Sequence, residues 1–467
     1  MSKINPYIFR TYDIRGKYPQ ELNQEVVYKI ALAYGRLFPK LKKIVVQTDI
    51  RKSGQDLKRG LIKGLKEGNK EIIDIGQGPI PLMYFSVCYY PFDGGIAITA
   101  SHLPKEYSGL KMQTQNAYPV ISDDLEKIKN MVEAGHKTET DNQMAKAEIT
   151  SFNPEPDYIN CLTQKIKFKK PLKIVIDTGN GACGLLPEKI FKKLGCDVKT
   201  LFSQYDDSFP NHMPDPYEEK NLVFLQKEVL KQKADLGLAF DGDGDRIGII
   251  DNYGRVVKGD FYLLILAREA LKKKKGPVVI EIRTSMAFLE EMGKNKVKTY
   301  LTVGHHKAVL DKIKETKAVF GGETTGHLYF PNEYYLYDDA IFASLKIAQI
   351  TSVKGDLAAY IDTLPRYSAS PEIFIPTADK VKHGLIKKLH NYLKKNNYDF
   401  IGIDGARINF SNGWALARAA NTSPFIKCRF EGKTKKDLFL IEVRAIELFK
   451  KAGIKLTKEN YQELGLD

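Results

Sequence analysis

The sequence has few cysteines and no long hydrophobic run. Five cysteines stand among 467 residues, and no two of them form a C-x-x-C pair. Neither a disulfide framework nor a zinc site is therefore indicated, and we expect reduced, mostly buried thiols. No apolar stretch approaches the ~20 residues that a membrane span requires, and the opening MSKINPYIFR has no signal-peptide core. These absences predict a cytoplasmic globular protein that binds no membrane.

The chain also lacks a basic tail with interleaved aromatic residues, although it is basic overall. Its formal net charge is +15 at pH 7. The lysines are spread along helix-like stretches such as EALKKKKG and LIKKLHNYLKKNN. This spread favours a solvated surface and an attraction for small phosphorylated ligands over a nucleic-acid partner.

Three segments of the chain share one pattern. Residues 43–49, 173–179 and 277–283 are each a β-branched run that ends in polar residues and leads into a helix-like repeat. Such alternation predicts tandem α/β domains with mostly parallel strands. A hydrophobic content of 43% in 467 residues is enough for three or four domains with cores of their own.

The last hundred residues follow a different pattern. The segments DGARINFSNGWALAR, PFIKCRFEG and DLFLIEVRAIELFKKAG alternate with period two before a helix. We therefore expect a small C-terminal α+β domain with an antiparallel sheet. Composition changes at AEITSFNPEPDY, at DNYGRVVKGD and at DTLPRYSASPE, which follows a helix expected from about residue 338 to 353. The predicted domains are residues 1–149, 150–251, 252–364 and 365–467.

The most informative stretch is Asp241-Gly-Asp243-Gly-Asp245-Arg246, between the apolar runs DLGLAF and IGIID. In extended backbone, residues two apart point the same way, and the glycines let the chain curl around a small object. Oxygen ligands without histidine indicate a hard divalent cation, above all Mg²⁺. An Asp-Gly turn between hairpin strands explains one such pair but not three aspartates in alternation.

A serine follows another apolar run. The stretch TASHLP places Ser101 and His102 directly after GGIAI, the end of an expected buried strand. Serine, histidine and proline are ordinary in a turn at a strand end, so these residues alone leave a catalytic serine and a plain turn both open.

Three further stretches are suited to anionic or sugar ligands. FRTYDIRG sets Arg10 and Arg15 around Tyr12, GGETTGH follows an apolar strand, and RAANTSP is a loop of small residues. A glutamate accepts hydrogen bonds from sugar hydroxyls, and an arginine with small polar neighbours holds a phosphate. The alternative interpretations are a surface charge for the arginines of FRTYDIRG, a tight connection for GGETTGH and an ordinary loop for RAANTSP.

The order of these motifs resembles that of the α-D-phosphohexomutases. FRTYDIRG, TASHLP, DGDGDR, GETTGH and RAANTSP follow one another as in the bacterial phosphomannomutase/phosphoglucomutase enzymes, from Phe9 to about Phe430. The resemblance implies three related α/β domains and the α+β domain around a central cleft, each contributing one loop. It implies reversible phosphoryl transfer between positions 1 and 6 of mannose or glucose phosphates, through a phosphoserine and a hexose 1,6-bisphosphate.

The resemblance also implies roles for single residues. Ser101 is similar to the serine that carries the phosphoryl group, and with Asp241, Asp243 and Asp245 it forms the implied site for one Mg²⁺ per chain. The other implied catalytic residues are Arg15, His102, Lys111 and Arg246. The implied substrate-binding residues are Tyr12, Arg283, His305, Glu323, Thr325, His327, Arg418, Asn421, Thr422 and Ser423.

Further expectations concern partners and motion. Hexose 1,6-bisphosphate is expected as an activator and small sugar phosphates as partners, with the chain a monomer or a weak dimer. A hinge near Pro365 is expected to let the last domain close over the substrate and keep water out.

Some positions depart from the family pattern, and other functions stay open. The family commonly has asparagine at the position of Leu103 and serine at the positions of Thr325 and Ala420. It usually has lysine at the position of Arg283, so that departure keeps the charge. A phosphoglucosamine mutase is the main alternative, because GETTGH does not decide the sugar. A metal-dependent phosphatase would also use clustered aspartates but would need no separate serine loop. A basic binding protein would tolerate the loss of Ser101 or Asp243.

Overall fold

The computed structural model describes residues 4–10, 12–135, 148–420 and 424–466. The chain forms two compact units. The first unit comprises Met1–Tyr262 and Thr325–Ile361, and the second comprises Leu263–Thr324 and Asp362–Asp467.

The first unit begins with a seven-stranded mixed sheet in the order β1-β5-β4-β2-β3-β7, with β6 paired to β5. Strands β4, β2, β3 and β7 run parallel, whereas β5 is antiparallel to both β1 and β4. The strands are β1 (Ile14–Lys17), β2 (Lys43–Thr48), β3 (Glu71–Gln77), β4 (Gly94–Ile98), β5 (Tyr107–Thr114), β6 (Tyr118–Pro119) and β7 (Ile149–Ser151). The helical segments are η1 (Pro6–Ile8), α1 (Gln24–Leu37), α2 (Ser53–Glu67), α3 (Ile80–Tyr89), η2 (Gln115–Ala117) and α4 (Asp123–Glu133).

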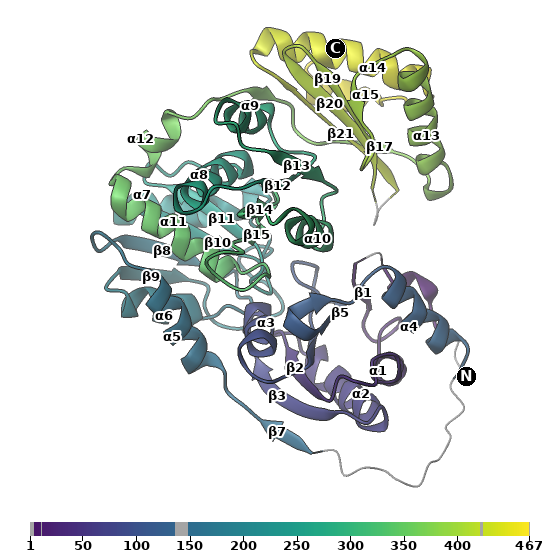
Figure 1. Ribbon diagram of the computed structural model, residues 1–467, viewed down its shortest axis with the longest axis vertical. Coiled ribbons are helices and arrows are strands. Elements are labelled where there is room, and N and C mark those ends of the chain that lie inside the picture. Colours follow the sequence, from purple (N-terminus) through teal and green to yellow (C-terminus); the bar gives the residue numbers. More distant parts are fainter. Residues whose placement is uncertain (1–3, 11, 136–147, 421–423, 467) are drawn as a thin grey trace. The chain divides into compact units, whose positions relative to one another are not determined.

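Helices α1 and α2 lie side by side against this sheet (Figure 1). Asn23 caps α1 by accepting hydrogen bonds from the amides of Glu25 and Val26. A Cβ atom at Gly60 or Gly64 of α2 would lie 2.2 or 2.3 Å from a carbonyl oxygen of α1. These two glycines therefore allow the backbones of the helices to approach each other closely.

The first unit also contains a four-stranded sheet in the order β11-β10-β8-β9. Strands β10, β8 and β9 run parallel, and β11 is antiparallel to β10. The strands are β8 (Lys173–Asp177), β9 (Asp197–Leu201), β10 (Leu236–Phe240) and β11 (Ile247–Asp251), and β15 (Leu328–Tyr329) belongs to the same unit. The helical segments are α5 (Glu155–Lys165), α6 (Leu186–Lys193), η3 (Glu219–Leu222), α7 (Val223–Gln232), α11 (Ala340–Lys354) and α12 (Leu357–Asp362).

The second unit combines parallel strands with an antiparallel sheet. Strands β13 and β14 lie parallel on either side of β12. These elements are β12 (Val278–Glu281), α9 (Met286–Lys294), β13 (Thr299–Thr302), α10 (His306–Thr316) and β14 (Phe320–Gly322), and most of α8 (Gly259–Lys273), whose first turn is counted with the first unit.

The C-terminal sheet has the order β16-β21-β20-β19-β18, with β17 paired to β21, and all its pairs are antiparallel. Its elements are β16 (Ser368–Ala369), β17 (Ile373–Pro376), α13 (Asp379–Lys395), β18 (Phe400–Ile401), β19 (Ala406–Phe410), β20 (Gly413–Ala419), β21 (Phe425–Gly432), α14 (Lys435–Lys451) and α15 (Lys458–Leu464).

The predicted fold class is confirmed, with one local error. The three repeated β-branched runs are the strands β2, β8 and β12, each followed by a helix. The expected period-two alternation of DLFLIEVRAIELFKKAG is wrong, because α14 covers this stretch from Lys435. A capping box between Thr434 and Asp437 starts the helix, and its buried residues Ile441, Ala445 and Phe449 recur at helical spacing. The predicted domain boundaries stay a prediction.

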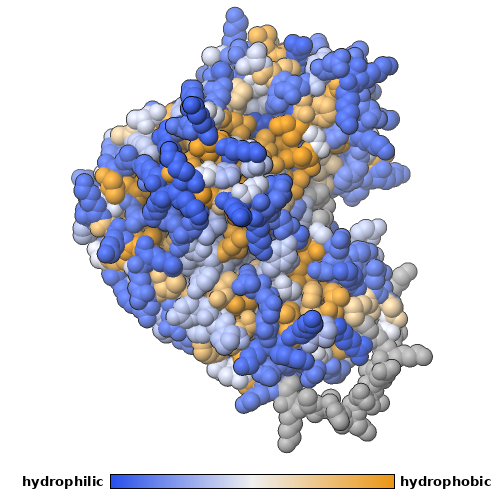
Figure 2. Space-filling view, in the orientation of Figure 1, coloured by the Kyte–Doolittle hydropathy of each residue, from blue (hydrophilic) through white to orange (hydrophobic). Residues whose placement is uncertain are grey.

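The surface carries many polar side chains. Figure 2 shows hydrophilic residues over much of the face in view, with apolar residues between them. Within the described ranges, no helix has the length and apolar character needed to cross a membrane.

Candidate active site

The serine loop, residues 99–104, begins where β4 ends. Ser101 is buried, and its backbone has φ 51°, in the left-handed region that residues other than glycine seldom adopt. Its amide donates a hydrogen bond to Thr99 Oγ1 (2.9 Å), and Arg15 Nη1 donates to the carbonyl oxygen of Ala100 (3.1 Å). Such strained residues persist only where their surroundings hold them, and they cluster at functional sites.

The aspartate loop, residues 241–246, connects the antiparallel strands β10 and β11. Asp241 Oδ1 accepts hydrogen bonds from the amides of Gly244 (2.9 Å), Asp245 (3.1 Å) and Arg246 (3.1 Å). Gly244 has φ 80°, a conformation suited to glycine. The expected extended backbone is therefore wrong: the loop is a turn that Asp241 closes on itself, and this turn brings the three carboxylates together.

The two loops pack directly against each other within the first unit. Ser101 Oγ donates to Asp241 Oδ2 (2.8 Å), and Thr99 Oγ1 donates to Asp243 Oδ2 (3.1 Å). A Cβ atom at Gly242 would lie only 2.2 Å from the carbonyl oxygen of Ser101. Glycine at position 242 is therefore required for this close approach.

Two basic side chains, Lys111 and Arg246, pair with these carboxylates, and a third, Arg15, pairs with Asp13. Lys111 Nζ lies 2.8 Å from Asp243 Oδ2 and 2.5 Å from Asp245 Oδ2. Arg246 Nε donates to Asp241 Oδ2 (3.1 Å), and Arg15 Nε donates to Asp13 Oδ2 (2.5 Å). Burial alone would lower the pKa of Lys111, but the carboxylates of Asp243 and Asp245 raise this pKa well above its usual value.

The carboxylates respond differently to the same surroundings. Burial, together with the carboxylates of Asp245 and Asp243, raises the pKa of Asp241 to about 7. Burial acts in the same direction on Asp243, but Lys111 and Arg15 outweigh it and lower the pKa of Asp243 below its usual value. The loop therefore concentrates negative charge in a buried place that needs cations.

The donor set fits a hard divalent cation. Asp241, Asp243 and Asp245 each offer a carboxylate oxygen, and these atoms lie within 4.8 Å of one another. Among the described residues, the buried atoms Asp243 Oδ1 and Asp245 Oδ1 have no hydrogen-bond partner. Oxygen ligands without sulfur suit Mg²⁺, and two buried oxygens without donors are what such an ion would satisfy.

His102 faces both the serine and an arginine. Its Nδ1 lies 3.1 Å from Ser101 Oγ and also accepts a hydrogen bond from Arg246 Nη2. A guanidinium group only donates, so Nδ1 is the unprotonated ring nitrogen in this contact. Burial and the charges of Arg246 and Arg15 lower the pKa of His102 well below its usual value. A neutral imidazole therefore stands beside the serine hydroxyl.

His327 lies near the same carboxylates. Its Nδ1 is 2.6 Å from Asp338 Oδ2 and 3.9 Å from Asp245 Oδ1. Gly326, with φ 104°, packs so closely on β11 that a Cβ atom there would lie 2.7 Å from the carbonyl oxygen of Ile247. The chain around Thr325 and His327 is thereby brought to the edge of the aspartate loop.

The other predicted substrate-binding residues are distributed as follows. Arg283, His305, Glu323 and Arg418 belong to the second unit, Tyr12 and Thr325 to the first, and Asn421, Thr422 and Ser423 lie outside the described residues. Arg283 Nε donates to Glu281 Oε2 (2.5 Å), and Arg418 Nη1 donates to Asp404 Oδ2 (2.9 Å). Burial lowers the pKa of His305 to about 4, and its Nδ1 caps α10 by accepting from the amide of Ala308.

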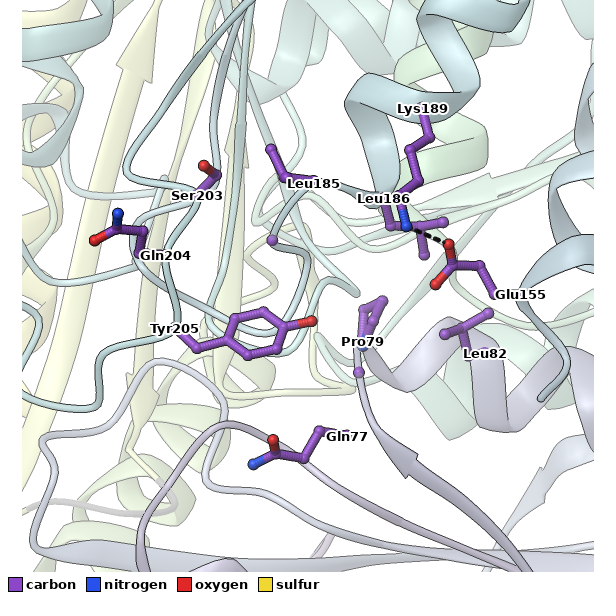
Figure 3. A pocket seen from close by; sticks show the side chains of 12 residues that line it. Gln77, Pro79, Leu82, Glu155, Leu185, Leu186, Lys189, Ser203, Gln204 and Tyr205 are labelled. Carbon is purple, nitrogen blue, oxygen red and sulfur yellow. Dashed lines mark hydrogen bonds and ion pairs between the residues drawn. The ribbon is translucent and has the colours of Figure 1, made fainter. Parts of the chain in front are cut away.

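A separate cavity of about 380 Å³ lies elsewhere in the first unit (Figure 3). Pro79 and Leu82 line one side, Leu185 and Tyr205 another, and the Lys189–Glu155 ion pair (2.6 Å) also lies on its wall. Its lining includes neither the serine loop nor the aspartate loop. The concentration of buried charge, rather than this cavity, therefore marks the candidate active site.

Several residues of the site were not predicted from the sequence. Asp215 lies 3.3 Å from Arg246 Nη1 and 3.9 Å from His102 Nε2. Its segment NHMPDP carries no catalytic pattern, so no local signal identifies it. Asp49 and Arg51 also contact the serine loop. Their position directly after the buried strand β2 is the signal that was available, because parallel strands end at a shared edge.

The fold and the facing loops define the class of protein as an α/β phosphotransfer enzyme of the phosphohexomutase kind. Four family models, described as Phosphoglucomutase/phosphomannomutase alpha/beta/alpha domains I, II and III and C-terminal domain, match residues 6–139, 156–254, 258–367 and 372–448. The chain belongs to the phosphoglucomutase/phosphomannomutase family. The predicted family, enzyme class and phosphoryl-transfer activity are confirmed.

Individual relatives agree with this assignment. A phosphomannomutase/phosphoglucomutase from Pseudomonas syringae pv. tomato is 32% identical over 440 residues, with 93% of each chain covered. A probable phosphoglucosamine mutase from Methanothermobacter thermautotrophicus is 31% identical over 451 residues, covering 95% of this chain and 98% of the relative. The crystal structure of a phosphoglucomutase/phosphomannomutase family protein from Burkholderia thailandensis matches with a TM-score of 0.90 and 29% identity, covering 97% and 99% of the two chains.

Proposed function

We propose that the chain moves a phosphoryl group between Ser101 and the hydroxyls at positions 1 and 6 of mannose and glucose phosphates. One observation carries this proposal: the Ser101 hydroxyl faces the three carboxylates of the aspartate loop at a buried place that holds three basic side chains. A serine in this setting is suited to carry a phosphoryl group, because both charge screening and a fixed orientation are available.

The reaction has two balanced halves. The bond between phosphorus and Ser101 Oγ breaks while a sugar hydroxyl oxygen bonds to phosphorus, and the proton of that hydroxyl is lost as Ser101 regains one. The product is a hexose 1,6-bisphosphate. After the bisphosphate reverses its orientation, Ser101 Oγ loses its proton and bonds to the other phosphorus while the bond from that phosphorus to the sugar oxygen breaks. The sugar oxygen takes up a proton, and the isomeric monophosphate leaves.

Positive charge is needed throughout, since a phosphomonoester carries nearly two negative charges. Arg15, Lys111 and Arg246 are placed to stabilise the oxygens of the transferring group, and neutral His102 lies 3.1 Å from the serine hydroxyl. Asp241, Asp243 and Asp245, with Ser101, would hold one Mg²⁺, which when bound would supply electrostatic stabilisation of the phosphoryl oxygens. A fungal N-acetylphosphoglucosamine mutase solved with magnesium shares the fold, at 16% identity and a TM-score of 0.62.

The remaining predicted residues are proposed to bind the sugar phosphate. We assign Tyr12, Glu323, Thr325 and His327 to the sugar, and Arg283 and His305 to further contacts. Arg418, Asn421, Thr422 and Ser423 are assigned to the phosphate that does not react. The proposal also includes a hinge near Pro365 and the four domain ranges predicted above. It further includes a cytoplasmic location, with the chain a monomer or a weak dimer.

A direct comparison of substrates tests which sugar phosphate the enzyme converts. The chain is 31% identical to a probable phosphoglucosamine mutase and 32% identical to a phosphomannomutase/phosphoglucomutase, so both activities are assayed. Coupled assays should use mannose 1-phosphate, glucose 1-phosphate and glucosamine 6-phosphate, with Mg²⁺ and trace glucose 1,6-bisphosphate as the proposed activator. We expect turnover of the first two and its loss in Ser101→Ala. Unchanged turnover in Ser101→Ala would contradict the phosphoserine, and phosphate release without isomerisation would favour a phosphatase.

A further inference from the structure

The serine loop is hydrogen-bonded to a buried ion pair, Asp49 with Arg51, that has no part in the reaction scheme. Strands β2 and β4 are parallel neighbours, with Thr48 paired to Ile98, so the residues that follow both strands meet at one edge of the sheet. Asp49 and Arg51 follow β2, and their side chains are 4% and 1% exposed. The Asp49 amide donates to the carbonyl oxygen of Ile98 (2.8 Å), which fixes this segment beside the start of the serine loop.

Arg51 contacts three carbonyl oxygens of the serine loop. Its Nη2 donates to Ser101 O (3.1 Å) and Leu103 O (2.5 Å), and its Nη1 donates to Pro104 O (2.8 Å). Its Nε donates to Asp49 Oδ2 (3.1 Å). Four of the five N–H groups of the guanidinium are therefore used, and the planar fork determines where the three carbonyl oxygens lie.

Asp49 also contacts the serine loop and orients Arg51. Its Oδ2 accepts a hydrogen bond from the amide of Ala100 (3.3 Å), and its Oδ1 accepts from the amide of Arg51 (3.0 Å). The guanidinium also lies over the ring of Phe209, 5.5 Å from its centre. Burying an ion pair is costly, so a pair kept here is better explained by the geometry it imposes than by stability.

We propose that Arg51, oriented by Asp49, is a positioning residue that holds Ser101 in its left-handed conformation and so directs the hydroxyl toward the aspartate loop. Neither side chain touches the reacting atoms. The inference rests on the proposed role of Ser101 as the phosphoryl carrier. It predicts that disturbing the pair lowers the rate of phosphoryl transfer and leaves the binding of the sugar phosphate largely intact.

Arg51→Lys is the sharpest test, because it keeps the charge beside Asp49 and removes the fork. The matched control is Lys58→Met, which breaks a partly buried ion pair between α2 and β3, Lys58 Nζ to Asp74 Oδ1 (2.5 Å), away from the serine loop. For Arg51→Lys we expect kcat to fall by about 100-fold, with KM changed by less than about threefold. Loading of Ser101 with phosphate from glucose 1,6-bisphosphate should slow by a similar factor. Lys58→Met should lose thermal stability but keep its kcat.

The outcomes are distinguishable. A kcat for Arg51→Lys that falls no more than that of Lys58→Met overturns the positioning role, as does a rise in KM at unchanged kcat. If Arg51→Lys does not fold, Asp49→Asn replaces it, with an expected fall in kcat of about 10-fold, and a wild-type kcat there also overturns the inference. Turnover by Ser101→Ala contradicts the proposed function itself, whereas an inactive Ser101→Ala beside a fully active Arg51→Lys contradicts this inference alone.

Discussion

The hydroxyl oxygen of Ser101 lies 2.8 Å from Oδ2 of Asp241, although 140 positions separate the two residues in the chain. The contact joins the end of a strand in the N-terminal sheet to a turn in the next sheet of the same unit. Both residues are buried, and Gly242 of the aspartate loop lets that loop approach the backbone of Ser101 closely. Phosphoryl transfer needs this kind of fixed alignment, since its catalysis depends mainly on position and charge.

Asp243→Asn should weaken Mg²⁺ binding. The substitution removes the charge of a carboxylate whose Oδ1 has no hydrogen-bond partner among the described residues. We expect the affinity for Mg²⁺ to fall by at least about 10-fold, since changes around metal ligands already have effects of that size. Titration calorimetry with MgCl₂ measures it. Asp251→Asn is the control, because Asp251 is buried at the other end of β11 and pairs with Arg255 (2.7 Å). Equal affinities in the two variants would contradict the assigned metal site.

Gly242→Ala should separate the serine loop from the aspartate loop. The added methyl group would lie 2.2 Å from the carbonyl oxygen of Ser101, so the backbone must shift. We expect kcat to fall by about 100-fold, because small displacements of reacting groups are that costly. Steady-state kinetics measures the loss. Gly384→Ala in α13, where an added Cβ meets nothing within 4 Å, should keep full activity and gain up to about 1 kcal/mol of stability. Wild-type kcat in Gly242→Ala would show that the close approach is dispensable.

Glu442→Gln should stabilise the C-terminal domain at alkaline pH. Burial raises the pKa of Glu442 in α14 to about 7. The unfolded chain therefore loses this proton at lower pH than the folded chain does, and stability falls as the pH rises from about 4.5 to about 7. The glutamine variant avoids this loss. We expect equal free energies of unfolding near pH 4 and a gain on the order of 1 to 3 kcal/mol at pH 8.

Urea unfolding followed by the fluorescence of Trp414 measures this effect, since Trp414 is the one tryptophan of the chain and lies in β20 of the same domain. Glu447→Gln, on the exposed side of α14, is the control and should change neither value. A gain in the Glu442→Gln variant that is the same at both pH values would point to helix propensity instead of the buried charge.

Much of the fold could be predicted from local pattern. The β-branched runs became β2, β8 and β12 because apolar residues that lead into helical repeats can be buried only in a sheet covered by helices. The stretch that forms α14 was wrongly expected to be a strand. An apolar segment such as DLFLIEV fits both the two-residue period of a strand and the 3.6-residue period of a helix over a short distance. The capping box of Thr434 and Asp437, at the start of the helix, is the local signal that distinguishes the two periods here.

The sequence by itself determined which residues are candidates for the chemistry: three alternating aspartates, a serine after a buried strand, and arginines within short motifs, because residue type and spacing are local properties. Only the tertiary structure decided that Asp241 closes its own turn, that Lys111 lies between two carboxylates, and that Arg51 binds the carbonyls behind Ser101. Those relationships join segments far apart in the chain, and they depend on strand order and on close backbone packing. No local pattern of residues encodes either of these.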